Sequence, residues 1–461
     1  MILPGSFIKR IQGQKYIDAE KLQRALKEPS PVSIRINTFK WKKRPLVSEA
    51  VPWCKNGYYL PSRPSYTLDP LFHAGCYYPQ EASGMFLEQM FLQTAGSLKN
   101  VRVLDLCGAP GGKSTLLSDI IGQDSLLVAN EVIRSRASTL AETITKWGSG
   151  NTLVTQSDPA VFGRLPGFFD VILVDAPCSG EGMFRTEIAI SEWSIENTIL
   201  CAERQKRILM AVWPALKEEG ILIYSTCTFN PGENEENIRW LTGRNEAECL
   251  RLDLKEFEGI KEIDYQGIYG YGFYPDRVRG EGFFITALRK RGRQEESSPK
   301  SHSMQEMKPG KRDLEIAAAW TDFSENSIIR RGDEIIGLPC GMDLYAYLFK
   351  NLKVVKAGTK ISVIKKKNLI PSYELALSSR LKTEAFPRQE LSLDEAISYL
   401  RRDNFIVMNI PKGWNIVTYK GINMGFIKNL GGRANNYFPV EWRIRLGVAA
   451  IRQANPISWF E

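Results

Sequence analysis

The stretch VRVLDLCGAPGGKSTLLSDII, residues 101–121, decides the fold of the chain. A short apolar run ends in a glycine-rich turn, and a segment with helical periodicity follows, with its leucines and isoleucines on one face. A strand, a glycine turn and a helix in this order are typical of the first unit of a nucleotide-binding α/β sheet. The ligand that the turn holds is therefore the central question for function.

The alternation of strand and helix continues to about residue 290. Nearly continuous apolar runs predict four further strands, at 125–130, 151–156, 169–175 and 220–226. Helical patterns lie between them, over about 134–147 and 196–219. Apolar strands alternating with helices indicate a parallel sheet covered on both faces, a Rossmann-like α/β domain. Residues 281–290 predict a last strand, antiparallel at the edge of the sheet.

Length and composition place this domain in a larger globular chain. With 461 residues the chain is long enough for two or three domains. No apolar run approaches the roughly 18 residues of a membrane span, and the first residues lack the apolar segment of a signal peptide. The eight cysteines form no C-x-x-C pair and there are only two histidines. We therefore expect a cytoplasmic protein without a metal site, a disulfide framework or a membrane partner.

Composition shifts along the chain predict the domain boundaries. The predicted parts are an N-terminal α+β domain (1–75), the Rossmann-like domain (76–291), a polar linker (292–312), a small connecting domain (313–390) and a β-rich module (391–461). The first contains a half-buried strand at 31–40, with Val32, Ile34 and Ile36 on its apolar face. In the last, Ser392 and Glu395 have the spacing of a capping box at the start of a helix.

Charge is distributed unevenly over these parts. The net charge is +9 overall, and it is +7 for residues 1–100, −6 for 101–310 and +8 for 311–461. Basic flanks around an acidic centre favour a polyanionic partner, most simply RNA bound through its phosphates. An ordinary solvated surface would give a similar distribution.

The glycine turn resembles a phosphate-binding loop but does not fit one. Cys107 stands where such a loop has its first glycine, and counting from Gly108 leaves the loop one residue short. Asp105 at the strand end would repel a triphosphate. A nucleotide hydrolase is therefore the weaker alternative, and ATP turnover would identify it.

S-adenosylmethionine is the ligand that the acidic residues favour. Glu131 ends the second strand, where a carboxylate can accept from ribose hydroxyls, and Asp158 follows the third, where one can accept from an adenine amino group. Either acid alone could be a helix cap or a solvated loop residue. Together with the glycine turn they predict a cofactor site at the carboxyl edge of the sheet.

Two cysteines lie in the loops after the next two strands. Cys178 follows the strand at 169–175, and Cys227 follows the strand at 220–226. Both loops are polar, so buried apolar thiols are not expected there. A thiolate that adds to C6 of cytosine makes C5 nucleophilic enough to take an activated methyl group, while a carboxyl group stabilises the ring and a second group assists release. Asp175 supplies the carboxyl, but this reasoning does not say which cysteine attacks.

These residues resemble a known family. The segments LDLCGAPGGKST (104–115), DAPCSGEGMFR (175–185) and YSTCT (224–228) closely resemble the motifs of RNA cytosine-C5 methyltransferases, and YYPQEASGMF (77–86) resembles the segment before them. The resemblance covers about residues 30–290. It implies that Cys227 is the nucleophile, that Cys178 assists product release and that Asp175 contacts cytosine N3. It also implies that S-adenosylmethionine is held by Cys107, Gly108, Ala109, Pro110, Gly111, Gly112, Lys113, Glu131, Asp158 and Asp175.

The rest of the chain is similar to bacterial small-subunit ribosomal RNA methyltransferases of the RsmF type. In these proteins a small connecting domain precedes a PUA-like RNA-binding module, which implies the same for residues 313–461. Aromatic residues that could stack on bases alternate there with basic residues that could contact phosphates. The aromatic set is Tyr419, Phe426, Tyr437, Phe438 and Trp442, and part of it would instead form the core of the module.

The sequence thus predicts an S-adenosylmethionine-dependent methyltransferase that makes 5-methylcytidine in 16S ribosomal RNA, within the 30S subunit, and acts as a monomer. A target base in a duplex would have to be flipped out to reach Cys227. Two alternatives stay open. One is the same chemistry on transfer RNA, and the other is a non-catalytic RNA-binding assembly factor.

Overall fold

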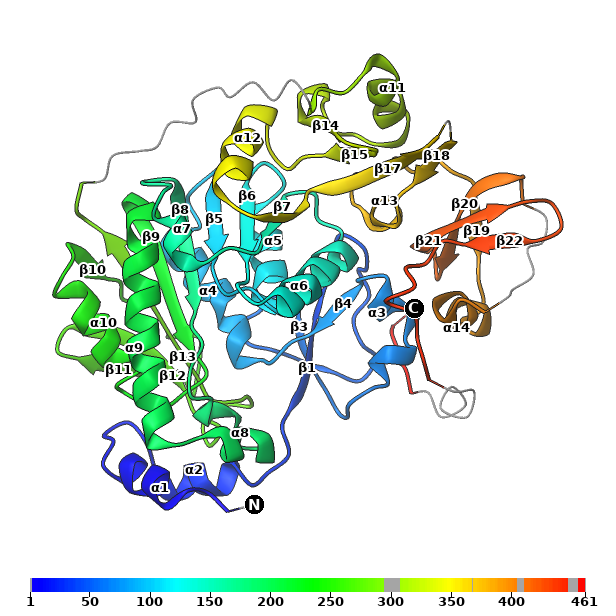
Figure 1. Ribbon diagram of the computed structural model, residues 1–461. Helices are drawn as coiled ribbons and strands as arrows, with labels where there is room; N and C mark the ends of the chain where they lie inside the picture. The colour runs from blue at the N-terminus through cyan, green and yellow to red at the C-terminus, as the bar shows by residue number, and fades with distance from the viewer. Residues whose placement is uncertain (1, 294–306, 367, 404–409, 447–454, 461) are drawn as a thin grey trace.

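The computed structural model describes residues 2–293, 307–366, 368–403, 410–446 and 455–460. A ten-stranded mixed sheet forms its centre, and three four-stranded sheets lie around it (Figure 1). Within the described residues, no helix is both long and apolar enough to cross a membrane.

Five parallel strands form the middle of the large sheet, in the order β9–β8–β5–β6–β7. Their bounds are β5 Arg102–Asp105, β6 Leu126–Asn130, β7 Thr152–Thr155, β8 Phe169–Asp175 and β9 Leu216–Thr226. Each parallel connection runs through a helix, because a parallel pair cannot be joined by a tight turn. The prediction of a Rossmann-like α/β domain is confirmed.

Helices cover both faces of this sheet, and each interface is a buried apolar core. One face carries α4 (Leu87–Ala95), α5 (Gly112–Ile121) and α6 (Arg134–Trp147). The other face carries α7 (Pro159–Phe162), α9 (Ile195–Val212), α10 (Glu235–Thr242) and α12 (Met342–Asn351). Residues of β5, β6 and β8 are buried on both sides, as expected for the interior of a parallel sheet.

The strand expected at the edge of the sheet lies inside it. β13 (Phe283–Lys290) is antiparallel to β9, as predicted, but β12 (Ile268–Phe273) and β11 (Lys261–Tyr265) continue the sheet beyond it, and the short β10 (Ala247–Cys249) also pairs with β13. The prediction of an edge position was wrong because the glycine-rich hairpin at 261–273 lacks the long apolar run of a buried strand.

The opposite edge is also extended, by a strand from the connecting region. β16 (Val354–Ala357) pairs antiparallel with β7, so residues predicted to belong to a separate domain complete the central sheet. The rest of this region forms its own sheet, β14 (Ile328–Arg331), β15 (Glu334–Gly337), β17 (Thr359–Lys365) and β18 (Asn368–Pro371), with α11 (Lys311–Trp320) and α13 (Tyr373–Leu377). Most of the predicted linker at 292–312 lies outside the described residues, and α11 begins at its end.

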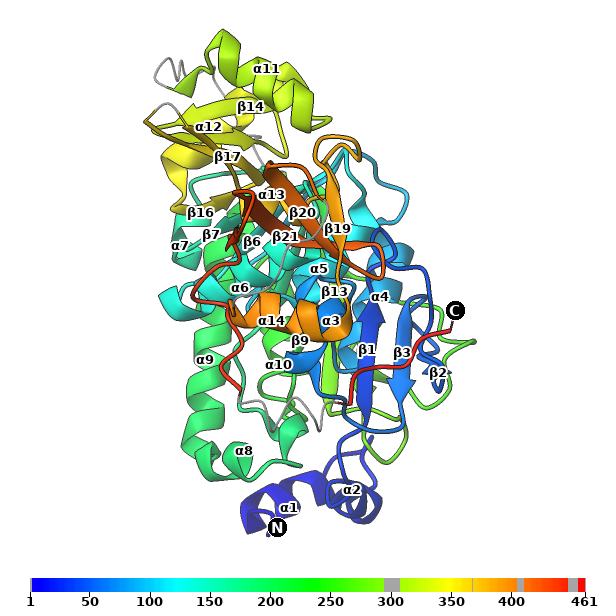
Figure 2. The same ribbon diagram turned by 90° about the vertical axis from the view of Figure 1, so that its right-hand side faces the viewer.

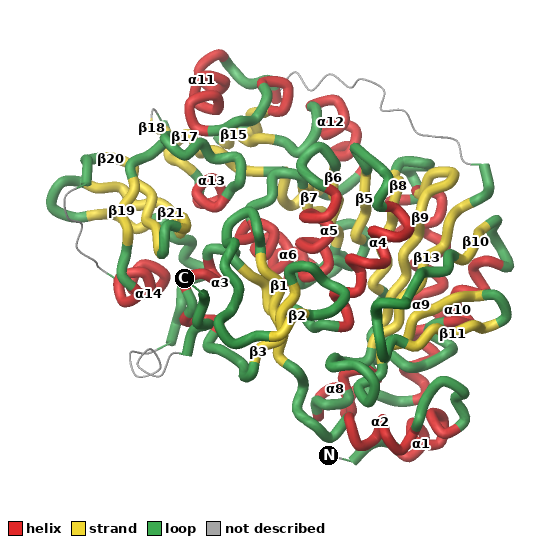
Figure 3. The backbone as a smooth tube through the Cα atoms, turned by 180° about the vertical axis from the view of Figure 1, so that it is seen from behind, coloured by secondary structure: helices red, strands yellow, loops and turns green. Residues whose placement is uncertain are grey.

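The N-terminal region has two helices at its start, a small sheet and a third, short helix. The first two helices are α1 (Gly5–Gln12) and α2 (Ala19–Ala25), which lie near α8 (Glu187–Glu192) in Figure 3. The sheet contains β1 (Val32–Ile36), β2 (Glu49–Ala50), β3 (Gly57–Leu60) and β4 (Tyr77–Pro79), and α3 (Pro70–His73) precedes its last strand.

The strand β1 is buried on both faces rather than on one. Ser33, Arg35 and Asn37, expected on its polar side, are all buried. Arg35 can be buried because it donates to Gln80, Asp119 and Thr115 across the interface with α5. The alternation of the sequence did not reveal that a second layer covers this face.

The C-terminal module consists of β19 (Arg388–Glu390), α14 (Leu393–Arg401), β20 (Gly413–Tyr419), β21 (Ile422–Asn429) and β22 (Ala434–Asn436). The predicted capping box is confirmed, since the Ser392 and Glu395 side chains each accept from the other's backbone N–H. Figure 2 shows α14 beside α3, and residues 455–460 return to the N-terminal region, where Trp459 contacts Trp41. Of the aromatic residues considered for RNA, Phe426 and Phe438 are fully buried in the core of the module.

Candidate active site

The candidate active site lies where the parallel strands end. Because β5, β6, β8 and β9 are parallel neighbours, the loops that follow them meet at one edge of the sheet. This edge contains the glycine turn after β5, Glu131 after β6, Asp175 at the end of β8 and Cys227 after β9.

Cys178 and Cys227 lie side by side. Their Sγ atoms are 2.9 Å apart, and both side chains are partly exposed. The pairing of β8 with β9 produces this contact, since Asp175 is opposite Ser225 and each loop continues in the same direction from that point. The backbone N–H of Cys227 also donates to the Cys178 sulfur, at 3.2 Å.

The contact with Cys227 changes the acidity of Cys178. The hydrogen bond to Cys227 and burial raise the pKa of the Cys178 thiol well above its usual value, and the backbone N–H of Cys227 offsets this only in part. The two sulfur atoms are within hydrogen-bonding distance of each other, and either thiol can be the donor.

Asp175 is fixed by partners on both carboxylate oxygens. Ser225 Oγ donates to Oδ1 at 2.7 Å, and Lys113 Nζ donates to Oδ2 at 2.8 Å. Burial lowers the pKa of Lys113, but Asp175 and, to a smaller degree, Cys227 and Asp105 more than offset this, so its pKa is raised. Lys113 therefore stays protonated and supplies a positive charge beside Asp175 and Cys227.

Two buried glutamates hold the cysteine loops in place, and the sequence analysis did not identify either of them. Glu233 is fully buried and accepts from Ser179 N at 2.9 Å, Ser179 Oγ at 2.5 Å and Gln205 Nε2 at 3.0 Å. Burial raises the pKa of Glu233 to about 7. Glu181 binds Arg10 of α1 and accepts from Trp193 Nε1 at 2.9 Å. The acidic run directly after the T-C-T motif was the available signal for Glu233.

The glycine turn leaves little room for larger residues. Gly111 has a φ of +117°, and a Cβ there would lie 2.6 Å from Thr143. A Cβ on Gly108 would lie 2.7 Å from Ser114 Oγ and 3.1 Å from Asp105 Oδ2. The turn therefore depends on glycine for conformation at one position and for space at the other.

The remaining residues of the turn lie around a buried carboxyl group. Asp105 is fully buried, accepts from Ser114 Oγ at 2.6 Å, and has a pKa that burial raises to about 7. Cys107 is partly buried and burial raises the pKa of its thiol, while the Ala109 carbonyl accepts from Arg136 at 3.1 Å. Pro110 is exposed, and Gly112 begins α5.

The two acids predicted to hold a cofactor are placed differently. Glu131 is buried; its Oε1 accepts from Ile133 N at 3.1 Å and its Oε2 lies 3.3 Å from Arg136 Nη2, without a hydrogen bond from any described residue. Asp158 is exposed and caps α7 by accepting from Ala160 N at 2.9 Å. The helix-cap role, considered from the sequence for either acid, is the one that Asp158 has.

The fold and this edge define a Rossmann-like methyltransferase. Residues 95–289 match the family model described as 16S rRNA methyltransferase RsmB/F, residues 3–82 match the N-terminal domain of 16S rRNA methyltransferase RsmF, and residues 386–444 match the Methyltransferase RsmF PUA domain. The chain belongs to the ribosomal RNA small subunit methyltransferase F family. The β-rich C-terminal module is thus the PUA domain that the sequence predicted.

Individual relatives support this assignment over the full length. The chain is 30% identical to Ribosomal RNA small subunit methyltransferase F of Aliivibrio fischeri (strain MJ11), over 96% of this chain and 98% of the relative. It is also 30% identical to the protein of that name from Shewanella piezotolerans (strain WP3 / JCM 13877), over 89% of this chain and 91% of that relative. A solved methyltransferase homologue from Pyrococcus horikoshii is 28% identical with a TM-score of 0.51, and the match covers 62% of this chain and 100% of that one.

Proposed function

We propose that this protein uses S-adenosylmethionine to methylate C5 of cytosine in 16S ribosomal RNA, through a covalent bond between Cys227 and C6 of the base. The observation that carries the proposal is the contact of Cys178 with Cys227 at the ends of two adjacent strands, one of which also ends in Asp175. The relatives named above are small-subunit ribosomal RNA methyltransferases, which supports this RNA as the substrate class.

The residues at the cofactor edge fit S-adenosylmethionine. Asp105 Oδ1 and Glu131 Oε2 are buried without a hydrogen bond from any described residue, so the edge offers acceptors to a ligand with hydroxyl and amino donors. The turn from Cys107 to Lys113, with Glu131, Asp158 and Asp175, would hold it. When bound, S-adenosylmethionine supplies a methyl group activated by its sulfonium.

Cys227 is the nucleophile in this proposal. A free thiol is mostly protonated at neutral pH, so the site must stabilise the thiolate. Lys113 interacts electrostatically with Cys227, and the Cys178 thiol can donate a hydrogen bond to the Cys227 sulfur. The thiolate adds to C6 of the cytosine ring, which makes C5 nucleophilic.

Asp175 positions and stabilises the ring during this addition. Its carboxylate is fixed by Ser225 and Lys113, so its free lone pairs have a defined direction for accepting a hydrogen bond from the base, from the exocyclic amino group or from N3 once that atom is protonated. A preorganised group of this kind lowers the barrier because it does not need to reorient as charge develops.

Cys178 assists product release. After methylation a water molecule takes the C5 proton, and the electrons of that C–H bond restore the 5,6 double bond. The bond between Cys227 and C6 then breaks, and the departing sulfur takes up negative charge. Cys178 lies 2.9 Å from that sulfur and keeps its proton, so it is placed to stabilise the leaving thiolate. Without Cys178 the covalent intermediate should accumulate.

The other parts of the chain would bind the RNA. The N-terminal and C-terminal flanks carry net charges of +7 and +8, and the PUA domain exposes part of Tyr419, Tyr437 and Trp442. These residues can contact phosphates and stack on unpaired bases. Assembled 30S subunits are the substrate that we expect.

Transfer of labelled methyl groups from S-adenosylmethionine to 30S subunits, naked 16S RNA and total transfer RNA tests the proposal. We expect label in 16S RNA as 5-methylcytidine, its loss in Cys227→Ala, and a protein–RNA adduct stable to denaturing gels in Cys178→Ala. Label confined to transfer RNA would overturn the ribosomal substrate but not the chemistry. RNA binding without methyl transfer in all three pools would favour a non-catalytic assembly factor.

A further inference from the structure

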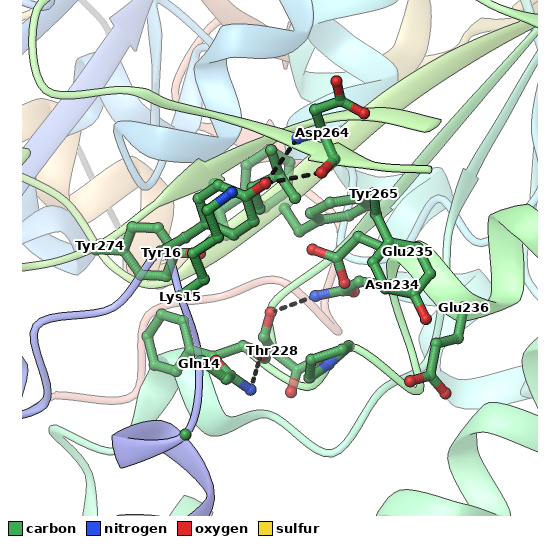
Figure 4. Close-up of a pocket in the computed structure, with 17 residues that line it drawn as sticks. Gln14, Lys15, Tyr16, Thr228, Asn234, Glu235, Glu236, Asp264, Tyr265 and Tyr274 are labelled. Atoms are coloured by element: carbon green, nitrogen blue, oxygen red, sulfur yellow. Dashed lines mark hydrogen bonds between the residues drawn. The ribbon is translucent and has the colours of Figure 1, made fainter. Parts of the chain in front are cut away.

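A cavity of about 340 Å³ lies beside the cysteine loops and is not used by the proposed reaction. Four segments enclose it: the loop after α1, the loop from Thr228 to the start of α10, the hairpin of β11 and β12 with Tyr274 after it, and the start of β13 (Figure 4). This volume is large enough for a nucleobase or a similar planar ring.

The cavity shares two of its walls with the active site. Phe229 follows Cys227 by two residues, and its backbone carbonyl accepts from Gln14 Nε2 at 3.2 Å. On the other side, the ring of Phe283 lies 5.2 Å from Nζ of Lys113, which binds Asp175. A group bound in the cavity would therefore be a near neighbour of a base held at Cys227.

A buried carboxyl group faces this space. Glu235 is 6% exposed, and its Oε2 has no hydrogen bond from any described residue. Figure 4 shows its carboxyl group among the aromatic side chains, next to the Asn234 amide, which is already used to bind the Thr228 carbonyl. A buried polar atom without a partner is costly, so an oxygen left free in a cavity points to a ligand that donates to it.

Aromatic rings provide flat surfaces around Glu235. Phe229 and Tyr274 are stacked, with centroids 5.7 Å apart and an angle of 23° between the rings. Tyr16 and Tyr265 are partly exposed at the opening. Rings of this kind hold a planar base by stacking, with little dependence on which base it is.

Basic residues beside Tyr16 and Tyr265 favour RNA as the source of the ligand. Lys15 and Lys261 lie 5.4 Å and 5.6 Å from the centre of the Tyr16 ring, and Arg239 lies 6.0 Å from that of Tyr265. They can contact the phosphates on either side of a base that enters between the two tyrosines. Burial raises the pKa of Glu235 to about 7, so charge repulsion between this carboxyl group and the phosphates is reduced near neutral pH.

We propose that this cavity binds a second nucleobase of the RNA substrate, one with an exocyclic amino group that donates to Glu235 Oε2 while its ring stacks on the tyrosines. The base is a neighbour of the target cytosine, turned out of its stack. Bound there, it would fix the RNA strand relative to Cys227. This inference rests on the proposed function for the identity of the substrate.

Binding of short RNA chains tests whether Glu235 recognises the amino group of a base. In the Cys227→Ala background, which cannot form the adduct, oligoadenylate and oligocytidylate 12-mers should bind several-fold more tightly than oligouridylate, because uracil has no amino group. We expect Glu235→Leu to abolish this preference. Glu235→Gln should keep it, because the amide oxygen still accepts a hydrogen bond. Glu258→Leu, at an exposed position outside the cavity, is the matched control.

Steady-state methyl transfer to 30S subunits gives the second readout. We expect Glu235→Leu to raise KM for the subunit about tenfold with kcat changed less than twofold, as for the loss of one recognised base. Tyr265→Ala should raise KM several-fold and remains informative if Glu235→Leu does not fold.

Three outcomes would overturn the inference. The first is an unchanged base preference and KM in Glu235→Leu. The second is a loss of the base preference in Glu235→Gln equal to that in Glu235→Leu. This would indicate that the ligand is an amine of a protein partner, which needs a fixed negative charge on residue 235. The third is tighter binding of free nucleosides than of the 12-mers. Failure of the proposed methylation would be seen separately, because the binding measurements involve no methyl transfer.

Discussion

The two halves of the carboxyl edge differ in how their polar groups are satisfied. On the side of β8 and β9, Asp175 has partners on both oxygens, Cys178 contacts Cys227, and Glu233 holds Ser179 by two hydrogen bonds. On the side of β5 and β6, Asp105 and Glu131 each keep a buried oxygen without a hydrogen bond from any described residue, and that of Glu131 has only an ion pair with Arg136 at 3.3 Å.

This difference separates groups that react from groups that bind. Side chains that carry out covalent chemistry need a fixed geometry, so their partners come from the protein itself. Side chains that hold a small ligand need free acceptors, so their partners arrive with the ligand. The comparison predicts that substitutions on the first side lower kcat and substitutions on the second side weaken cofactor binding.

The largest effect is expected for Asp175→Asn. The amide retains the size of the side chain but cannot keep the charge that pairs with Lys113, so kcat for methyl transfer should fall by roughly a thousandfold, within the usual range for such groups. Single-turnover assays with saturating S-adenosylmethionine measure this, with exposed Asp124→Asn as the control. A fall of less than tenfold would show that the fixed carboxylate is not required.

A smaller effect, on binding, is expected for Glu131→Gln. A charge-assisted hydrogen bond contributes about 1.5–3 kcal/mol, so its replacement by a neutral amide should raise Kd for S-adenosylmethionine roughly tenfold and leave kcat nearly unchanged. Titration calorimetry measures Kd directly. A drop in kcat at saturating cofactor, with Kd unchanged, would contradict the division between the two sides.

Asp105→Asn should change the pH dependence of stability. The pKa of Asp105 is raised to about 7 in the folded protein, above that of the unfolded chain, so the folded state retains this proton longer and stability falls as pH rises from about 4 to 7. The variant should remove up to about 2 kcal/mol of this fall between pH 5 and 7.5. Urea unfolding at several pH values measures the free energy of unfolding. If it has the same pH dependence in Asp105→Asn as in the wild type, the prediction is wrong.

The smallest effects are expected at Asp158, where binding and structure can be separated. Asp158→Ala should lose the cap of α7, at a cost of roughly 1 kcal/mol, and Asp158→Ser should keep it. Both substitutions should raise Kd for S-adenosylmethionine by a few fold, because both remove the carboxylate. If Asp158→Ser binds the cofactor as well as the wild type, Asp158 is a helix cap and nothing more.

The sequence was sufficient to predict the parallel sheet and the position of the Cys178 and Cys227 loops at its carboxyl edge, but not the contact between the two cysteines. Apolar runs and the direction of the strands determine the sheet and this position, since parallel strands deliver their loops to one edge. The sequence did not predict that Glu233 and Arg35 are buried, because a charged residue in a polar or alternating segment gives no sign of burial. Their burial depends on donors and acceptors that come from distant parts of the chain.

At the edges of the sheet, too, contacts with distant parts of the chain could not be predicted from the sequence. The strand β16 is short and contains Lys356, so nothing in its pattern indicates pairing with β7. Only the position of the whole connecting region brings the two together. Phe426 and Phe438 are similar cases, because an aromatic residue among basic ones is compatible with RNA stacking and with a core.

The pairing of β16 with β7 limits how the protein can be dissected. A fragment that ends before residue 293 would leave β7 as a bare edge strand, available for pairing between molecules and hence prone to aggregate. It would also lose the bonds from Gln156 N to the Lys353 carbonyl and from Lys353 N to Ser157 Oγ, which support the loop carrying Asp158. We therefore expect a stable fragment to retain β16, although every residue assigned to the chemistry precedes it.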